Sequence, residues 1–137
     1  VDTCHLVNNG LDLIPTLCDG VGIEVPCGLR GRSLLPAVLG GEPGDGRACV
    51  ASETVGGRMV RTPRYKYCLY VYDGRADEYL FDLVEDPGEQ VNLASRGDVQ
   101  PLLEQHREML AAWVEMEEDD RGREYLATVD EGGNPAG

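Results

Sequence analysis

Basic side chains gather at one place in an otherwise acidic sequence. The chain has 137 residues, with 12 Lys and Arg against 25 Asp and Glu, and a formal net charge of −13 at pH 7. Against this background, Arg58, Arg61, Arg64 and Lys66 follow one another closely. Such a group could steer an anionic ligand, for example a sulfated or phosphorylated sugar. It could equally be the charged surface of a strand, because exposed charge discourages pairing between sheet edges.

Two further features could do chemistry, and each has a simpler interpretation. Glu53 could act as a general base, but without an evident partner it is more typical of a salt-bridge acid. The glycine-flanked arginines of Gly28–Ser33 precede a possible helix start and could form an anion-binding loop. A turn whose arginines offset nearby acids is the favoured interpretation of that segment.

Potential metal ligands are present but poorly spaced. The five cysteines form no Cys-x-x-Cys pair and have only His5 and His106 to join them, which argues against zinc. We expect the cysteines to behave as small buried hydrophobic residues, and their spacing does not decide whether any two form a disulfide. The acidic run over residues 115–120 lacks the ligand spacing of a calcium loop, so a solvated, frayed helix end is expected. No metal or cofactor is therefore predicted to bind this chain, and His106 is predicted to be structural.

Several classes of function are excluded by what the sequence lacks. It has no Gly-x-Ser-x-Gly elbow, Walker loop, Gly-x-Gly-x-x-Gly or His-Glu-x-x-His. The negative charge argues against a nucleic-acid partner, and no apolar run approaches the roughly 20 residues of a membrane helix. Val1–Leu6 shows no secretory signal, so the compartment stays open. The hydrophobic content of 42% is enough for a globular core.

A few short elements must position these side chains. Apolar residues recur at three- and four-residue steps between residues 6 and 18, which indicates a helix, but Pro15 falls inside the pattern. We expect Pro15 in the first turn of a helix over residues 15–21; the alternative is an earlier helix that kinks at Pro15. Glycines and prolines then predict an irregular connection over residues 20–46, with one or two helical turns over residues 33–39.

From Arg47 the pattern changes to a period of two. Strands are predicted over residues 48–53, 57–62, 65–72 and 78–83, with a turn at Asp73–Gly74. The short links imply an antiparallel sheet. On the third strand, one face is more apolar and is expected to point toward the core: Tyr65, Tyr67, Leu69 and Val71.

A long helix is predicted over residues 99–118, with Asp98 as its N-cap. Val114 lies at the margin of an apolar stripe that should cover the sheet and that contains Leu102, Leu103, His106, Met109, Leu110 and Trp113. The predicted fold class is therefore α+β: a small four-stranded antiparallel sheet packed against a long C-terminal helix, preceded by a short helix and an irregular Gly/Pro-rich loop. The expected divisions are residues 1–46, residues 47–120 and a flexible tail over residues 121–137.

Four segments between about residues 6 and 118 carry a specific pattern. They are Asp12-Leu13-Ile14-Pro15-Thr16-Leu17, Gly31-Arg32-Ser33-Leu34-Leu35-Pro36, Arg61-Thr62 with Arg64-Tyr65-Lys66-Tyr67, and Leu80-Phe81-Asp82-Leu83 with Asp86-Pro87-Gly88-Glu89 and Asn92-Leu93. In this order they resemble the C-terminal region of the sulfatase (arylsulfatase-like) family, within the alkaline-phosphatase-like superfamily. The resemblance implies a C-terminal α+β subdomain over residues 47–120 and, over residues 1–46, the tail of a missing catalytic domain. Asn92 and Leu93 would tie the descending chain to the sheet.

The resemblance implies chemistry for a parent enzyme rather than for this chain alone. Sulfatases hydrolyse sulfuric esters with a hydrated formylglycine, made from a Cys/Ser-x-Pro/Ala-x-Arg motif, and with calcium as a Lewis acid. None of the five cysteines begins that motif. Calcium and formylglycine are thus expected in the parent, and no catalytic or metal-binding residue is expected here. If any residues of this chain face the substrate, they are predicted to be Arg58, Arg61 and Glu53.

Two alternatives remain beside a sulfatase fragment. The chain could be a free-standing anion-binding or interaction module, or a fragment of a related phosphate or phosphonate ester hydrolase. The fragment interpretation predicts an exposed apolar surface, on the sheet or along Leu11, Ile14 and Leu17, where the catalytic domain or a second copy of the chain would pack.

Overall fold

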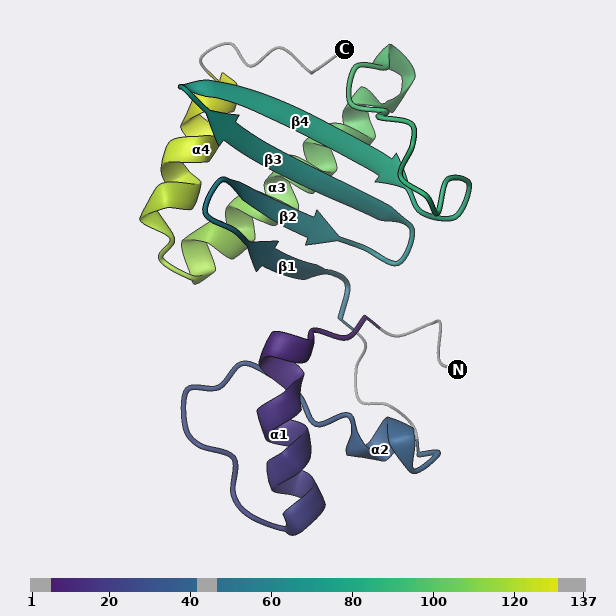
Figure 1. The fold of residues 1–137 in the computed structure, drawn as a ribbon, viewed down its shortest axis with the longest axis vertical. Coiled ribbons are helices and arrows are strands. Elements are labelled where there is room, and N and C mark those ends of the chain that lie inside the picture. Colours follow the sequence, from purple (N-terminus) through teal and green to yellow (C-terminus); the bar gives the residue numbers. More distant parts are fainter. Residues whose placement is uncertain (1–5, 42–46, 131–137) are drawn as a thin grey trace. The chain divides into compact units, whose positions relative to one another are not determined.

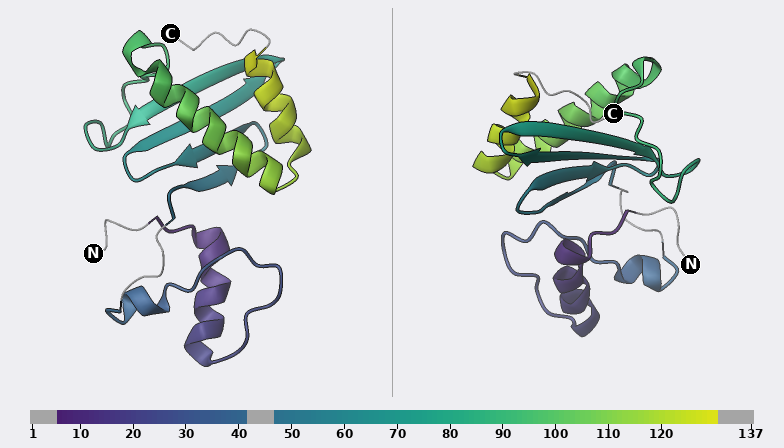
Figure 2. Two further views of the ribbon diagram at one scale, coloured as in Figure 1. Left: turned by 180° about the vertical axis from the view of Figure 1, so that it is seen from behind. Right: turned by 45° about the horizontal axis from the view of Figure 1, so that its top comes forward.

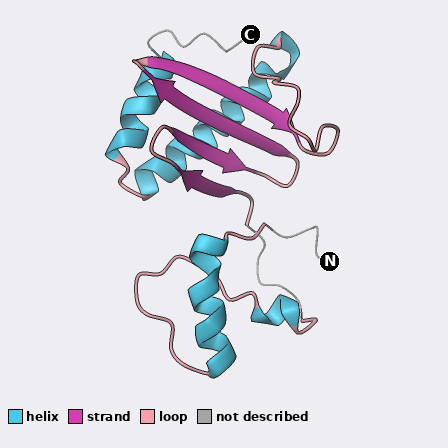
Figure 3. Cartoon of the chain, in the orientation of Figure 1, coloured by secondary structure: helices cyan, strands magenta, loops and turns pink. Residues whose placement is uncertain are grey.

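The structure is a computed structural model that describes residues 6–41 and 47–130. The chain forms two compact units, Val1–Val50 and Ala51–Gly137. Figure 1 shows the elements in chain order and Figure 3 distinguishes helices from strands. None of the described helices is both long enough and apolar enough to span a bilayer.

The first unit is built on the helix α1, Asn9–Val21. Its start corrects the predicted start at Pro15, which lies inside the helix. The reason is an earlier cap: Asn8 accepts a hydrogen bond from the Gly10 backbone, and its own backbone N–H donates to Asp12 at 2.8 Å. The helix ends at Gly22, whose φ of 71° suits glycine.

Pro15 interrupts the hydrogen-bond pattern of α1. A proline has no N–H to donate to the carbonyl four residues earlier, here that of Leu11. The backbone of Gly31 passes against this carbonyl so closely that a Cβ on Gly31 would lie 1.8 Å from the Leu11 oxygen. The connection therefore approaches α1 at the turn where Pro15 removes a helical hydrogen bond, and only glycine allows that approach.

The connection returns along one side of α1. The backbone N–H of Arg32 donates to Asp12, and that of Leu34 donates to the Thr16 hydroxyl, both at 2.9 Å. A single helical turn, α2, follows at Leu35–Val38, within the predicted residues 33–39.

Asp12 is the buried centre of this unit. Its carboxylate is fully buried and accepts two hydrogen bonds from the Arg47 guanidinium, at 2.5 and 2.6 Å, besides those from Asn8 and Arg32. Burial alone would raise its pKa, but the bonds from Arg47 and from the two backbone amides lower the pKa to about 2. The carboxylate is therefore charged and fully satisfied inside the unit.

The second unit is a four-stranded sheet in the order β1-β2-β3-β4. The strands are β1 Val50–Glu53, β2 Gly57–Arg61, β3 Tyr65–Tyr72 and β4 Arg75–Asp82. β2 pairs antiparallel with β3, and β3 with β4. The Asp73–Gly74 turn has positive φ at both residues, 51° and 72°, so pairing starts directly at Arg75, before the predicted residue 78.

One face of the sheet is covered by helices. Seen from behind, α3 (Gln100–Met116) crosses the strands, and α4 (Asp120–Asp130) lies on the same face (Figure 2). The core contains Val60, Tyr67, Leu69 and Leu80 from the sheet with Leu103, Leu110 and Val114 from α3. This confirms the predicted α+β fold class and the inward face of the third strand, although Val114 lies in the buried stripe and not at its margin.

The start of α3 differs from the prediction. A 3-10 turn, η1 (Gly97–Val99), precedes it, and the cap position is Val99, without a side-chain hydrogen bond. The assignment of Asp98 as N-cap is therefore wrong. Asp98 instead binds the Arg96 guanidinium at 2.6 Å.

α4 lies where a flexible tail was predicted to begin. The chain reverses at Glu118, which has a φ of 54°. Asp119 then accepts from the Gly122 backbone and from Arg58 of β2, and the Tyr125 hydroxyl donates to the Val55 carbonyl. Most side chains of the acidic run over residues 115–120 are exposed, as expected, but these contacts hold the helix end in place, so the expectation that it frays is wrong. The rest of the predicted tail, residues 131–137, lies outside the described residues.

A second buried carboxylate joins the sheet to α3. Glu78 of β4 is 1% exposed and accepts from the Tyr67 hydroxyl at 2.6 Å and from Arg107 of α3 at 2.5 and 2.7 Å. Burial beside this carboxylate raises the pKa of Tyr67 well above its ordinary value, so the hydroxyl stays a donor. The polar network is thus complete within the core.

Replacing Asp12 by Asn should loosen the first unit. The change leaves the Arg47 guanidinium without a charged partner, and removing one member of a buried ion pair costs about 3 kcal/mol. Amide hydrogen exchange of Arg32 and of α1 should then be about a hundredfold faster. Asp19→Asn is the control, because Asp19 is exposed and binds only the Ser33 hydroxyl here. Equal effects from both variants would contradict the central role of Asp12.

Replacing Glu78 by Gln should destabilise the second unit. We expect a loss of about 2 kcal/mol, because Arg107 loses its buried carboxylate partner. Urea unfolding followed by fluorescence of Trp113, the only tryptophan, measures it. Glu104→Gln removes an exposed partner of the same arginine and should cost less than about 0.5 kcal/mol. The prediction fails if the two variants unfold at the same urea concentration.

Candidate functional site

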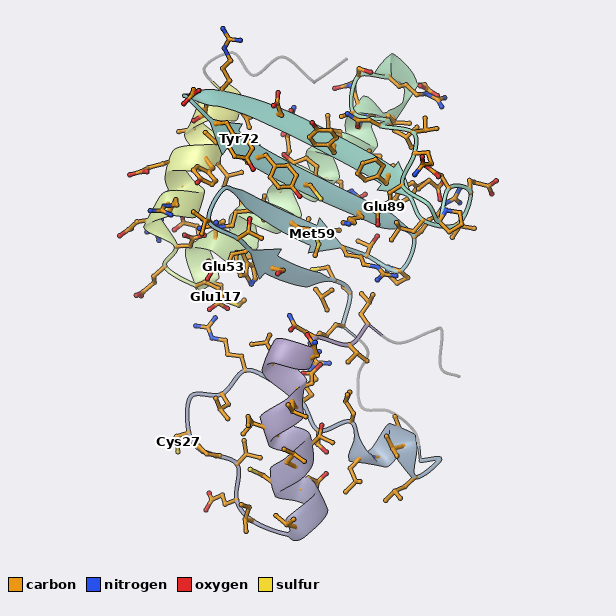
Figure 4. All side chains as sticks on the ribbon, viewed as in Figure 1. Cys27, Glu53, Met59, Tyr72, Glu89 and Glu117 are labelled. Atoms are coloured by element: carbon orange, nitrogen blue, oxygen red, sulfur yellow. The ribbon has the colours of Figure 1, made fainter. Side chains whose placement is uncertain are left out.

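The face of the sheet turned away from α3 and α4 carries a cavity of about 320 Å³. It lies between β2, β3 and the loop that follows β4, and its lining residues are Met59, Arg61, Lys66, Leu83, Pro87 and Glu89. Figure 4 shows Met59 and Glu89 on this open face. The two cations come from the basic group of the sequence, so this cavity is the candidate site.

Lys66 is held in place by Glu89. Its ammonium nitrogen lies 2.6 Å from the Glu89 carboxylate. Burial would lower the pKa of Lys66, but the hydrogen bond to Glu89 and the Coulombic attraction of Cys68, Glu89 and Tyr70 together raise it. The lysine is therefore charged, and its position is fixed by an ion pair.

The loop that carries Glu89 is shaped by Asp86. The Asp86 carboxylate accepts from the backbone of Gln90 at 2.7 Å and of Val91 at 2.8 Å, and its own N–H donates to the Asp82 carbonyl. Glu89 itself has a φ of 53°. The Asp-Pro-Gly-Glu segment thus turns Glu89 back onto β3.

Arg61, the second cation that lines the cavity, has no ion-pair partner among the described residues. It lies directly opposite Lys66 in the β2–β3 register and is exposed. Among residues 6–41 and 47–130, none forms an ion pair or side-chain hydrogen bond with it. Its guanidinium is available to a ligand.

The structure separates Arg58 and Glu53 from Arg61. Arg58 is buried on the helix-covered face, where it binds the Asp119 carboxylate at 2.5 and 2.9 Å. Glu53 lies 3.6 Å from the same guanidinium and is largely exposed. Neither residue lines the cavity, and Glu53 has the salt-bridge partner that the simpler interpretation expected.

Arg64 is also engaged. It donates three hydrogen bonds to the Asp82 carboxylate, at 2.7 to 3.2 Å, and its guanidinium lies over the Tyr65 ring. Three of the four basic side chains singled out in the sequence therefore bind carboxylates of the same chain.

The Gly28–Ser33 loop also binds carboxylates of its own unit. Arg32 contacts Asp12 through its backbone, and Ser33 contacts Asp19 through its hydroxyl at 2.5 Å. The loop therefore meets nearby acids, here through an amide and a hydroxyl.

His106 is a packed core residue. It is 1% exposed, its Nδ1 lies 2.8 Å from the Leu102 carbonyl, and its ring meets Tyr65 edge-on. No group of three or more His, Cys, Asp or Glu side chains in the described part of the chain is arranged to hold a metal ion. Cys18 and Cys68 are buried as expected, whereas Cys27 is exposed; Cys4 and His5 lie outside the described residues.

The sequence predicts the two cations of the cavity but not the other residues that line it. Asp86-Pro87-Gly88-Glu89 is recognisable as a turn, yet nothing in the sequence indicates that Glu89 returns to Lys66. The arrangement can bind and orient an anion. The described residues that line it include no pair of a nucleophile and a base.

Relatives among known proteins are sulfatases, although no family model matches the chain. A Δ4,5-hexuronate-2-O-sulfatase of Bacteroides thetaiotaomicron is 42% identical in an alignment 118 positions long, which covers 80% of this chain and 24% of that protein. Arylsulfatase K of Rattus norvegicus is 33% identical over 62% of this chain and 17% of its own length. The chain therefore spans about a quarter or less of these relatives.

Solved structures agree with the sequence comparison. A 2-O GAG sulfatase superimposes with a TM-score of 0.78 at 38% identity, over 88% of this chain and 27% of that structure. A phosphonate monoester hydrolase of Agrobacterium radiobacter is more distant, with a TM-score of 0.60 at 26% identity over 74% of this chain and 23% of its own. In sequence and in fold, the chain is similar over most of its length to one part of the sulfatases.

Proposed function

We propose that the chain is the C-terminal portion of a sulfatase, a sulfuric ester hydrolase. Alone it is non-catalytic; within the parent enzyme it supports the catalytic domain and borders the substrate cleft. Sequence identity of 42% to a sulfatase, of which it spans 24%, supports this assignment. The alkaline-phosphatase-like superfamily, named from the sequence motifs, is part of the same proposal.

The observation that carries the proposal is the surface of α1. The side of the helix that holds Asp12, Pro15 and Cys18 is buried within its unit. Its other apolar side chains are from 43% to 72% exposed: Leu11, Leu13, Ile14, Leu17 and Val21. A helix that is apolar on nearly all sides is normally enclosed in a larger core. The exposed surface predicted along Leu11, Ile14 and Leu17 is thus confirmed, and residues 1–46 fit the end of a catalytic domain.

Calcium and formylglycine belong to the proposed parent enzyme. The described residues do not fit either group, because they offer no cluster of metal ligands and no cysteine of the required motif. Both groups would therefore have to be held by the remainder of the parent. This chain would contribute support and, through Arg61, substrate contact, whereas the buried Arg58 and its partner Glu53 stabilise the sheet.

Hydrolysis of a phosphonate or phosphate ester is the second candidate. The likeness to a phosphonate monoester hydrolase, at 26% identity, favours it. The higher identity to sulfatases, 38% and 42%, places it behind sulfate ester hydrolysis.

The gene upstream of the Val1 codon should continue as an open reading frame. We expect that frame to encode a Cys/Ser-x-Pro/Ala-x-Arg motif, and the protein expressed from it to hydrolyse 4-nitrophenyl sulfate faster than bis(4-nitrophenyl) phosphate or a phosphonate monoester. The 137-residue chain alone should hydrolyse none of the three. A stop codon before Val1 would overturn the proposal, and a preference for the phosphonate would favour the second candidate.

The exposed surface of α1 should bind a hydrophobic dye. We expect the chain to enhance the fluorescence of anilinonaphthalene sulfonate, and Ile14→Ser with Leu17→Ser to lower that signal at least threefold, because the change removes exposed apolar surface. Hydrogen exchange of Arg32 should stay unchanged, since neither residue touches Asp12. Sedimentation tests whether a second copy covers the same surface: a dimer that the double variant abolishes would replace the catalytic domain as the proposed occupant.

A further inference from the structure

We infer that the cavity lined by Arg61, Lys66 and Glu89 binds a singly charged oxyanion of an acidic sugar, either a sulfate ester or a carboxylate. Its apolar wall would contact the sugar ring. The choice of a sugar rests on the proposed function. The preference for a singly charged group rests only on the charges that line the cavity.

The first step is the unpaired charge of Arg61. The chain has about twice as many acidic as basic residues, and the neighbouring cations Arg58, Arg64 and Lys66 each bind a carboxylate. Arg61 is exposed and binds no carboxylate of the described residues, although acids are abundant. A guanidinium presents two parallel N–H donors, which match the two oxygens of a carboxylate or sulfate.

The second step is the net charge of the cavity. Arg61 and Lys66 contribute two positive charges, and Glu89 contributes one negative charge 2.6 Å from the lysine. The net charge of +1 is balanced by one negative charge. A sulfate ester or a carboxylate carries one, whereas a phosphate monoester carries about 1.5 to 2 at pH 7. Glu89 would therefore both position Lys66 and disfavour a doubly charged ligand.

The third step is the shape and the wall of the cavity. A volume of about 320 Å³ is at the small end of ligand pockets and suits one sugar residue. Met59, Leu83 and Pro87 supply the apolar wall. Sugar rings have apolar C–H faces, so such a wall can pack against a ring whose charged substituent reaches Arg61.

Aromatic side chains lie beside the cavity on the same face of the sheet. Phe81 lies directly opposite Lys66 in the β3–β4 register, and its ring stacks on that of Tyr79. Tyr79 meets Tyr70 edge-on, and Tyr70 stacks on Tyr72. This row of aromatic rings leads from the cavity along the open face, and Figure 4 shows Tyr72 near the opposite end of β3.

The test uses the whole chain and four probes that differ only in their charged group: glucose 6-sulfate, glucuronate, glucose 6-phosphate and glucose. Binding is measured by NMR from the shifts of the Arg61 and Lys66 amides. We expect saturable binding of glucose 6-sulfate or glucuronate, at least fivefold weaker binding of glucose 6-phosphate, and none of glucose. Whichever of the first two binds more tightly identifies the oxyanion.

Arg61→Gln should weaken that binding at least tenfold, and Arg75→Gln is the matched control. Arg75 is also exposed and without an ion pair in the described part of the chain, and it lies opposite Tyr72. That position is about 20 Å along β3 from Lys66, at roughly 3.3 Å per residue. An equal loss from both variants would mean non-specific attraction and would overturn the inference. So would unchanged binding in Arg61→Gln.

Glu89→Gln tests whether the net charge of the cavity decides its preference between singly and doubly charged ligands. The variant raises the net charge of the cavity, so binding of glucose 6-phosphate should improve relative to glucose 6-sulfate by at least threefold. An unchanged ratio would overturn the charge-matching step. These measurements need no catalysis, so failure of the oxyanion site is distinguishable from failure of the sulfatase assignment, which depends on the upstream gene and on activity.

Discussion

The structure depends on one constraint: a buried carboxylate must find enough donors to replace water. In the first unit the buried carboxylate is that of Asp12. Its donors are the backbone N–H of Asn8 at the helix cap, the backbone N–H of Arg32 and the guanidinium of Arg47. In the second unit the buried carboxylate is that of Glu78, which joins two strands to α3. In each unit, the path of the chain is therefore fixed by where these donors have to be.

The same constraint explains the sequence motifs. Asp12 and Thr16 of the first motif bind the backbone of Arg32 and Leu34 in the second, and Gly31 gives the close approach. In the last motif, Asn92 accepts from Leu80 and donates to the Glu78 carbonyl, so the chain after β4 is tied to the sheet as predicted. Several residues that make the sulfatase resemblance specific are thus architectural, and Arg61 differs from them because its side chain has no hydrogen-bond or ion-pair partner in the part of the chain that the structure describes.

The elements whose signal is local could be predicted from the sequence. β3 has the predicted bounds, and the α3 stripe and the Asp73–Gly74 turn follow from periodicity and turn chemistry. The predictions that failed have two causes. The early start of α1 depends on a local cap between Asn8 and Asp12, which the apolar pattern does not reveal. The helix α4 depends on distant contacts with Arg58 of β2 and with the Val55 carbonyl. The pairing of Arg58 with Asp119, 61 residues apart, likewise decides that Arg58 is structural.

The buried carboxylates of this chain have hydrogen-bond partners, whereas many apolar side chains of α1 are not buried. The buried carboxylates Asp12 and Glu78 are satisfied by residues of their own units. The apolar side chains of α1 are not, because Ile14, Leu17 and Val21 remain exposed. Hydrogen bonds are directional and short-ranged, whereas burial is cumulative and can be supplied by any apolar neighbour. A unit can therefore keep its own polar geometry while its hydrophobic surface stays exposed, which is the division that α1 displays.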